Sequence, residues 1–166
     1  MAGARILVAE ALTAEAFAPF GDVIEAAGAP DFSFNGAMAD RFHDLARLDF
    51  AGAGARPGIS IAIARPYGLP HVLDLVERHP LGSQAFVPLD PAPFLVVVAP
   101  DAGGRPGRPQ AFLTRPGQGV NYLRGIWHGV LTPLGAPQRF LVIDRIAPGE
   151  NLEEHRFAAA WTVTAA

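Results

Sequence analysis

The segment GVNYLRGIWHGV, residues 119–130, carries a tyrosine, an arginine and a histidine on one short stretch. In an extended strand Tyr122 and Arg124 point to the same face, and His128 joins them if the alternation continues through Gly125. An arginine can hold a carboxylate with two hydrogen bonds, a histidine can accept a proton, and a tyrosine can donate one. The segment therefore predicts a surface that binds a small acidic molecule. The alternative is an ordinary polar face turned to solvent.

A second group of polar side chains lies in ERHPLGSQAFVPL, residues 77–89. Glu77 and His79 are two residues apart and share a face of an extended chain, and Gln84 can return to the same place across a Leu-Gly turn. The spacing is similar to the first metal motif of cupins, with Glu in place of the first His and Gln in place of the Glu. With His128 these residues form a ligand set suited to a divalent metal such as Ni, Mn, Fe or Zn. The alternative is that they satisfy backbone groups in a turn and that the protein works without a metal.

A third cluster lies in FNGAMADRFHDLA, residues 34–46. Asn35 and Gly36 form a tight-turn dipeptide, and His43 follows in a segment that alternates as a strand does. Arg41 has the parity of His43, so the strand expected over RFHDLA would place both side chains on one face. Asn35 and His43 are therefore candidate substrate-binding residues.

Short apolar or alternating segments must position these side chains. Sixteen prolines and eighteen glycines separate them, and such punctuation favours a sandwich or barrel over alternating strands and helices. The chain is therefore predicted to be a single all-β domain over residues 1–166. A short N-terminal helix is expected after Thr13, a suitable N-cap, and Pro19 ends it. The segment LPHVLDLVERHP, residues 69–80, fits a strand or a short helix.

The composition excludes several classes of function. All thirteen basic residues are arginines, so there is no lysine Schiff base or Walker-type phosphate loop, and arginine or histidine must supply any cationic contact. Cysteine is absent, which removes disulfides and thiolate ligands. A net charge of −3 with scattered arginines is atypical of a nucleic-acid binder. The longest clean apolar run, FLVVVA, is too short for a membrane span and no secretory signal is recognisable, so a cytoplasmic protein is expected.

In this order, the motifs resemble those of the ureidoglycolate lyase family. The similarity runs over nearly the whole chain and rests on LTAEAFAPFGDVIE, DRFHDLA, HPLGSQAFVPL, GVNYLRGIWHGVL and FLVIDR. It implies a cupin-like β-barrel or jelly roll and a homodimer. It also implies the cleavage of (S)-ureidoglycolate to glyoxylate and urea in allantoin and purine breakdown.

That cleavage needs a cation for the carboxylate, a base for the hydroxyl proton and a proton donor for the departing urea. Arg124 is the first choice to hold the carboxylate, and Arg65 is the second. His128 or Glu77 would take the hydroxyl proton, and Tyr122 would protonate the urea. A bound metal changes the assignment, because the acid–base residues Glu77 and His128 would then be metal ligands. The full ligand set would be Glu77, His79, Gln84 and His128.

Two positions depart from the family pattern. The family reads Trp-His-His-Pro where residues 127–130 read Trp-His-Gly-Val, so Gly129 stands in place of a second histidine. The family also places an arginine where this chain has Ile63, and Arg65 shares the face of Ile63 in an extended strand. These departures leave two other functions open. One is a small-acid binding module without catalysis, and the other is a metal-dependent cupin isomerase or oxygenase acting on another substrate.

Overall fold

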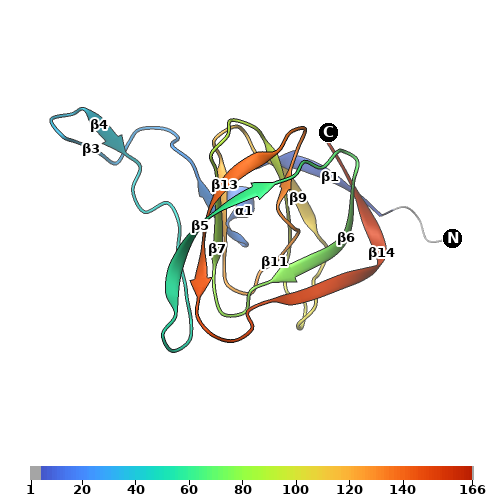
Figure 1. The fold of residues 1–166 in the computed structure, drawn as a ribbon. Coiled ribbons are helices and arrows are strands. Elements are labelled where there is room, and N and C mark those ends of the chain that lie inside the picture. The colour runs from blue at the N-terminus through green and yellow to red at the C-terminus, as the bar shows by residue number, and fades with distance from the viewer. Residues whose placement is uncertain (1–4, 166) are drawn as a thin grey trace.

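The computed structural model describes residues 5–165, which form fourteen strands and one short helix. The strands make two main sheets and one separate hairpin (Figure 1). The prediction of an all-β fold with a short N-terminal helix is confirmed. Within the same range, no helix has the length and apolar character needed to cross a membrane.

Six strands close into a mixed barrel. The first strand lies parallel to both of its neighbours, whereas the other pairs are antiparallel. A two-residue strand closes the ring, because it pairs with a different barrel strand on each side. Around the ring the strands are β11 (Trp127–His128), β6 (His71–Arg78), β14 (Glu153–Ala165), β1 (Ile6–Ala11), β9 (Gln110–Leu113) and β8 (Phe94–Ala99), and β12 (Thr132–Pro133) pairs with β8.

A second sheet of five strands packs against one side of the barrel. Phe140 of this sheet meets Phe94 of β8 and its own neighbour Phe86 edge to face, in an apolar core shared by the two layers. The strands of this sheet are, in spatial order, β2 (Gly21–Ile24), β10 (Gly119–Tyr122), β7 (Gln84–Pro88), β13 (Gln138–Ile146) and β5 (Arg56–Ala64).

A separate apolar core fills the inside of the barrel, since its buried side chains come from all six barrel strands. β8 supplies both cores by alternation: Val96 and Val98 face the second sheet, and Leu95 and Val97 face the barrel interior. A strand covered on both faces needs apolar residues at every position. This explains why FLVVVA is an unbroken apolar run in the sequence.

The helix α1 (Ala14–Phe17) begins where the sequence predicts. The side chain of Thr13 accepts a hydrogen bond from the backbone N–H of Ala16 at 3.2 Å, and Phe17 is fully buried in the core between the sheets. The ambiguous segment 69–80 is a strand, because β6 finds partners on both sides in β14 and β11.

A hairpin of β3 (Phe32–Phe34) and β4 (Ala39–Arg41) stands apart from the body of the molecule (Figure 1). The strand expected over residues 41–46 is wrong beyond Arg41. The backbone N–H of His43 donates to the Asp31 carboxylate at 2.8 Å, and Asp44 has a φ of 53°. A side chain thus takes the place of a neighbouring strand, and the backbone turns out of the extended region.

Candidate active site

One wall of the site is the pairing of β6 with β11. Glu77 and His128 are direct partners in this antiparallel pair, so both side chains leave the same face of the barrel. Their neighbours Val76 and Trp127 point the other way, into the barrel core. His79 lies two residues after Glu77, and the ligand atoms of Glu77, His79 and His128 all lie within 4.8 Å of one another. We call these three residues the Glu-His-His cluster.

The facing wall comes from the second sheet. Tyr122 of β10 is buried, and its ring stacks on the His128 ring with a centroid distance of 4.2 Å and an interplanar angle of 2°. Gln84 of β7 is the direct strand partner of Tyr122. The site therefore lies where the edge of the barrel meets the second sheet, with the cluster on one side and Tyr122 on the other.

The segment 119–130 is not one continuous strand. β10 ends at Tyr122, Gly125 has a φ of 77°, and β11 begins at Trp127 in the other sheet. Parity along a single strand therefore does not bring Tyr122 and His128 together. They meet because the chain turns between the two sheets and brings its two ends face to face.

The two histidines are oriented by backbone carbonyls. Nδ1 of His79 lies 2.7 Å from the carbonyl oxygen of Asn151, and Nδ1 of His128 lies 3.0 Å from that of Gly129. A carbonyl can only accept, so each Nδ1 carries the proton and each Nε2 presents a lone pair. Both Nε2 atoms are buried and make no hydrogen bond within residues 5–165. Two imidazoles held in this tautomer are prepared to bind a cation.

Burial controls the ionisation of the site. It lowers the pKa of His128 to about 3, opposed by the hydrogen bond to the carbonyl of Gly129 and assisted by the nearby His79, so His128 is neutral near pH 7. Burial raises the pKa of Glu77, against the influence of His79 and with that of Glu154. Burial, with the charge of Glu77, also raises the pKa of Tyr122, so its phenol keeps its proton.

Gln84 connects the site to β13. Its amide nitrogen donates to Asp144 at 3.4 Å, while its carbonyl oxygen is buried and has no partner in the described part of the chain. The unpaired oxygen is the atom that a metal would use, and a ligand role for Gln84 stays a prediction. Sequence reasoning missed Asp144, although it follows Phe140 and Val142 on one face of β13 and breaks their apolar pattern.

Arg124 lies in the turn between β10 and β11. Its Nε pairs with Asp49 at 3.1 Å, and about half of each side chain is exposed. Asp49 is held in place because its backbone exchanges hydrogen bonds with Ser83, at 2.9 Å and 2.8 Å. The ion pair uses one edge of the guanidinium, so the terminal nitrogens can still bind a carboxylate.

Comparison with known proteins identifies the family. A family model described as ureidoglycolate lyase matches residues 4–164. The chain is 57% identical over 159 residues to the ureidoglycolate lyase of Chelativorans sp., covering 96% of each chain. It is 64% identical over 149 residues to that of Rhodobacter capsulatus, covering 90% of this chain and 92% of the relative. The chain belongs to the ureidoglycolate lyase family.

The surroundings of Gly129 show which way a side chain at this position would point. A β-carbon at position 129 would lie 3.3 Å from Cβ of Val97 and 3.5 Å from Cδ1 of Leu73. Both residues belong to the core inside the barrel, on the opposite face from His128. On this backbone a second histidine would therefore point away from the Glu-His-His cluster.

Ile63 and Arg65 lie away from the cluster along the second sheet. Ile63 is 75% exposed on the outer face of β5 and pairs with Arg139, five residues along β13 from Asp144. Arg65 follows the last residue of β5 and is exposed. A substrate-binding role for Arg65 stays a prediction.

Asn35 and His43 belong to the projecting hairpin region. Asn35 has a φ of 55° in the turn, and the ring of His43 packs on Phe32 at 5.7 Å. Figure 1 shows this hairpin well apart from β6 and β11, so the fold of the single chain does not bring these residues to the Glu-His-His cluster. Their binding role also stays a prediction. The residue that orients His79, Asn151, was missed because a backbone carbonyl has no sequence signature.

Proposed function

We propose that this chain is a ureidoglycolate lyase that cleaves (S)-ureidoglycolate to glyoxylate and urea, a step in allantoin breakdown. Relatives that bear this name are 55–64% identical over at least 90% of the chain. The observation that carries the proposal is the partly buried Glu-His-His cluster with the ring of Tyr122 stacked on His128. A cytoplasmic location follows from the same assignment, and cell fractionation tests it.

The cleavage moves two protons and breaks one bond. The substrate hydroxyl loses its proton, the carbon–oxygen bond becomes a carbonyl, and the electrons of the carbon–nitrogen bond leave with the urea nitrogen, which gains a proton. Tyr122 is placed to protonate that nitrogen, because burial keeps its phenol in the acid form. Arg124 holds the substrate carboxylate at the mouth of the site.

We infer that Glu77, His79 and His128 hold a divalent metal such as Ni, Mn or Zn, with Gln84 as a further ligand. The two unprotonated Nε2 atoms and the carboxylate fit such an ion, and leaving buried acceptors unpaired costs free energy otherwise. When bound, the metal supplies Lewis acidity toward the substrate carboxylate and hydroxyl. Without a metal, Glu77 is the base, since burial raises its pKa toward neutrality.

The test is release of urea and glyoxylate from ureidoglycolate by protein treated with a chelator, with and without added Ni, Mn or Zn. We expect release that depends on the metal and is lost in His128→Ala. His71→Asn, a histidine outside the cluster, is the matched control and should keep activity. Equal release with and without metal would contradict the metal site but not the lyase. No release under any condition would contradict the lyase.

A second candidate is an iron-dependent oxygenase, favoured by the two-histidine, one-carboxylate set. Tightly bound iron together with oxygen uptake would support it. The binding module without catalysis loses its main support, because Gly129 faces the barrel core rather than the cluster.

We infer that the protein is a homodimer through the outer face of the second sheet. Ile59, Ile61 and Ile63 alternate along β5 and are 73%, 57% and 75% exposed. An exposed row of large apolar side chains favours an interface, and a two-fold dimer would bury it against its own copy. Light scattering should give a dimer for the wild type and a monomer for Ile61→Asp. A wild-type monomer would contradict the interface.

We further infer that the chain acts as one domain. β8 contributes to both apolar cores, so the barrel and the second sheet cannot fold apart. A single thermal transition is expected, and two separate transitions would contradict it.

A further inference from the structure

A hollow of about 410 Å³ outside the Glu-His-His cluster is lined by three arginines. Arg5, Arg105 and Arg108 line it together with His155 and Trp161, and none of its lining residues is an aspartate or glutamate. None of them belongs to the cluster or its facing wall. The hollow is therefore a separate feature of the molecule.

The three arginines have no carboxylate partner within residues 5–165. Six of the thirteen arginines form ion pairs, and these three are among the seven that do not. Arg5 is held in position by a hydrogen bond from its NH1 to the carbonyl of Ala159 at 3.1 Å. The guanidinium carbons of Arg5 and Arg108 lie 4.7 Å and 5.8 Å from the ring centre of Trp161.

Trp161 lines the hollow and also carries a buried N–H without a partner in residues 5–165. The other tryptophan, Trp127, donates its Nε1–H to Asp101 at 3.0 Å. A buried indole N–H normally finds a partner, so Trp161 differs from Trp127 in this respect.

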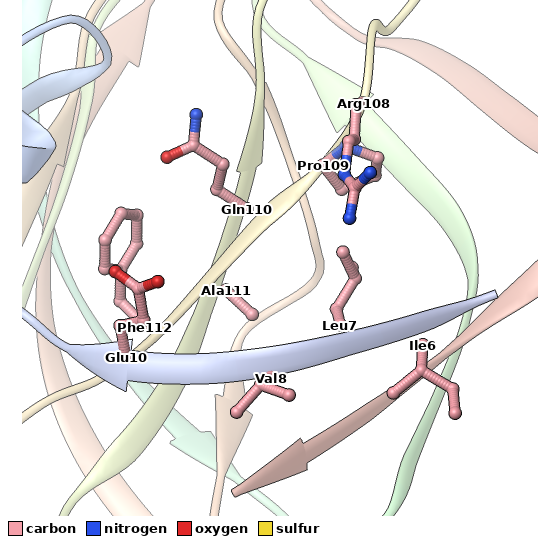
Figure 2. Close-up of a pocket in the computed structure, with 9 residues that line it drawn as sticks. All are labelled: Ile6, Leu7, Val8, Glu10, Arg108, Pro109, Gln110, Ala111 and Phe112. Carbon is pink, nitrogen blue, oxygen red and sulfur yellow. The ribbon is translucent and has the colours of Figure 1, made fainter. Parts of the chain in front are cut away.

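Arg108 also makes no ion pair with Glu10, the carboxylate in a neighbouring hollow that Arg108 helps to line. A neighbouring hollow of about 370 Å³ is lined by both Arg108 and Glu10. Figure 2 shows the guanidinium of Arg108 above Leu7 and the carboxylate of Glu10 at the opposite end, and no ion pair joins them. β1 and β9 pair only from Glu10 and Phe112 onward, so the two strands are not paired at the end where Arg108 lies.

We propose that the hollow lined by Arg5, Arg105, Arg108 and Trp161 binds a small oxyanion with two or more charges, a phosphate or a dicarboxylate. Guanidinium groups recognise such oxygens in pairs, and the Trp161 ring beneath Arg5 and Arg108 lies next to the anion they would bind. The volume suits a small molecule. A nucleic-acid strand is disfavoured, because guanidinium groups already lie against the Trp161 ring that a base would stack on.

The two indole N–H signals of the folded protein test the proposal. Titration with inorganic phosphate, followed by ¹⁵N–¹H correlation spectra, should move the Trp161 signal along a saturating curve. The Trp127 signal, held by Asp101, should move far less. Trp161→Phe assigns the two signals. A parallel titration with succinate distinguishes a dicarboxylate site from a phosphate site, and sodium chloride at equal ionic strength controls for screening.

The double variant Arg105→Gln/Arg108→Gln should raise the dissociation constant at least about tenfold, since each lost charge-assisted contact contributes roughly that factor. Arg156→Gln is the matched control, because Arg156 is an exposed arginine that pairs with Asp74 and does not line the hollow. It should leave the affinity unchanged. A linear shift that chloride reproduces, or equal affinity in the double variant, would overturn the proposal.

Discussion

Replacing Glu77 by glutamine should change the stability of the protein in opposite directions with and without metal. In the metal-free protein, the Glu77 carboxylate faces two Nε2 lone pairs, and all three are acceptors. The glutamine amide is nearly the same size but carries two N–H donors, which can reach the two imidazoles. The variant therefore offers a donor to each of the two unpaired Nε2 atoms.

The size of the gain follows from those two contacts. At about 1 kcal/mol of net stabilisation for each new hydrogen bond, Glu77→Gln should raise the free energy of unfolding by about 1–2 kcal/mol. For a chain of this length that is a rise in Tm of roughly 2–8 °C. With metal the wild type should become the more stable of the two proteins. A ligand at 100 times its Kd stabilises the protein that binds it by about 2.7 kcal/mol, and the variant loses this stabilisation because it lacks the Glu77 carboxylate.

The pKa of Glu77 fixes how the difference depends on pH. Burial raises the pKa of Glu77 in the folded protein. The protonated group therefore stabilises the fold at a pH below its ordinary pKa, about 4.3, and this stabilisation is lost as the pH rises through the pKa of the folded protein. The advantage of the glutamine variant should therefore be full above the folded pKa, shrink as the pH falls through that value, and be smallest below about pH 4.3.

Thermal unfolding followed by circular dichroism, in chelator and in excess Ni, Mn or Zn, measures both halves of this prediction. Glu154→Gln is the matched control, because Glu154 pairs in register with Glu77 but is exposed and outside the cluster. The stability of Glu154→Gln relative to the wild type should have the same sign in chelator and in metal. A Glu77→Gln variant that is less stable than the wild type in chelator would refute the account of three facing acceptors. A wild-type Tm that no metal raises would refute the metal site.

Three further predictions follow from single side chains. Tyr122→Phe keeps the ring stacked in the core, so stability should change by less than about 1 kcal/mol while turnover falls about 100-fold or more; equal turnover would exclude the phenol as proton donor. Burial alone would raise the pKa of Asp22, but hydrogen bonds from Arg47 and Asn121 outweigh it and lower the pKa. Asp22→Asn should therefore cost about 1–2 kcal/mol at pH 7, and the difference from wild type should vanish as the pH falls below about 4; a difference independent of pH would contradict this. Gly21→Ala should cost about 3 kcal/mol or more, because its β-carbon would overlap the carbonyl oxygen of Asn121 in the paired strand; a shift in the denaturation midpoint near zero would contradict that geometry.

Much of this protein could be predicted before any tertiary contact was known. Frequent Pro and Gly with short apolar segments indicated an all-β chain, because those residues end strands locally. Thr13 and Pro19 bounded the helix for the same local reason. The two-residue spacing of Glu77 and His79 placed them on one face wherever β6 came to lie. The motif combination indicated the family.

The site itself was decided by contacts between distant parts of the chain. Tyr122 and His128 lie on different sheets, and only the turn at Gly125 and the packing of the sheets bring their rings to 4.2 Å. The carbonyl of Asn151 sets the tautomer of His79 from 72 residues away. The core packing around Gly129 likewise decides which face a side chain there would take. Local patterns specify a residue's face along its own strand, but which faces meet depends on sheet packing, which no short stretch of sequence encodes.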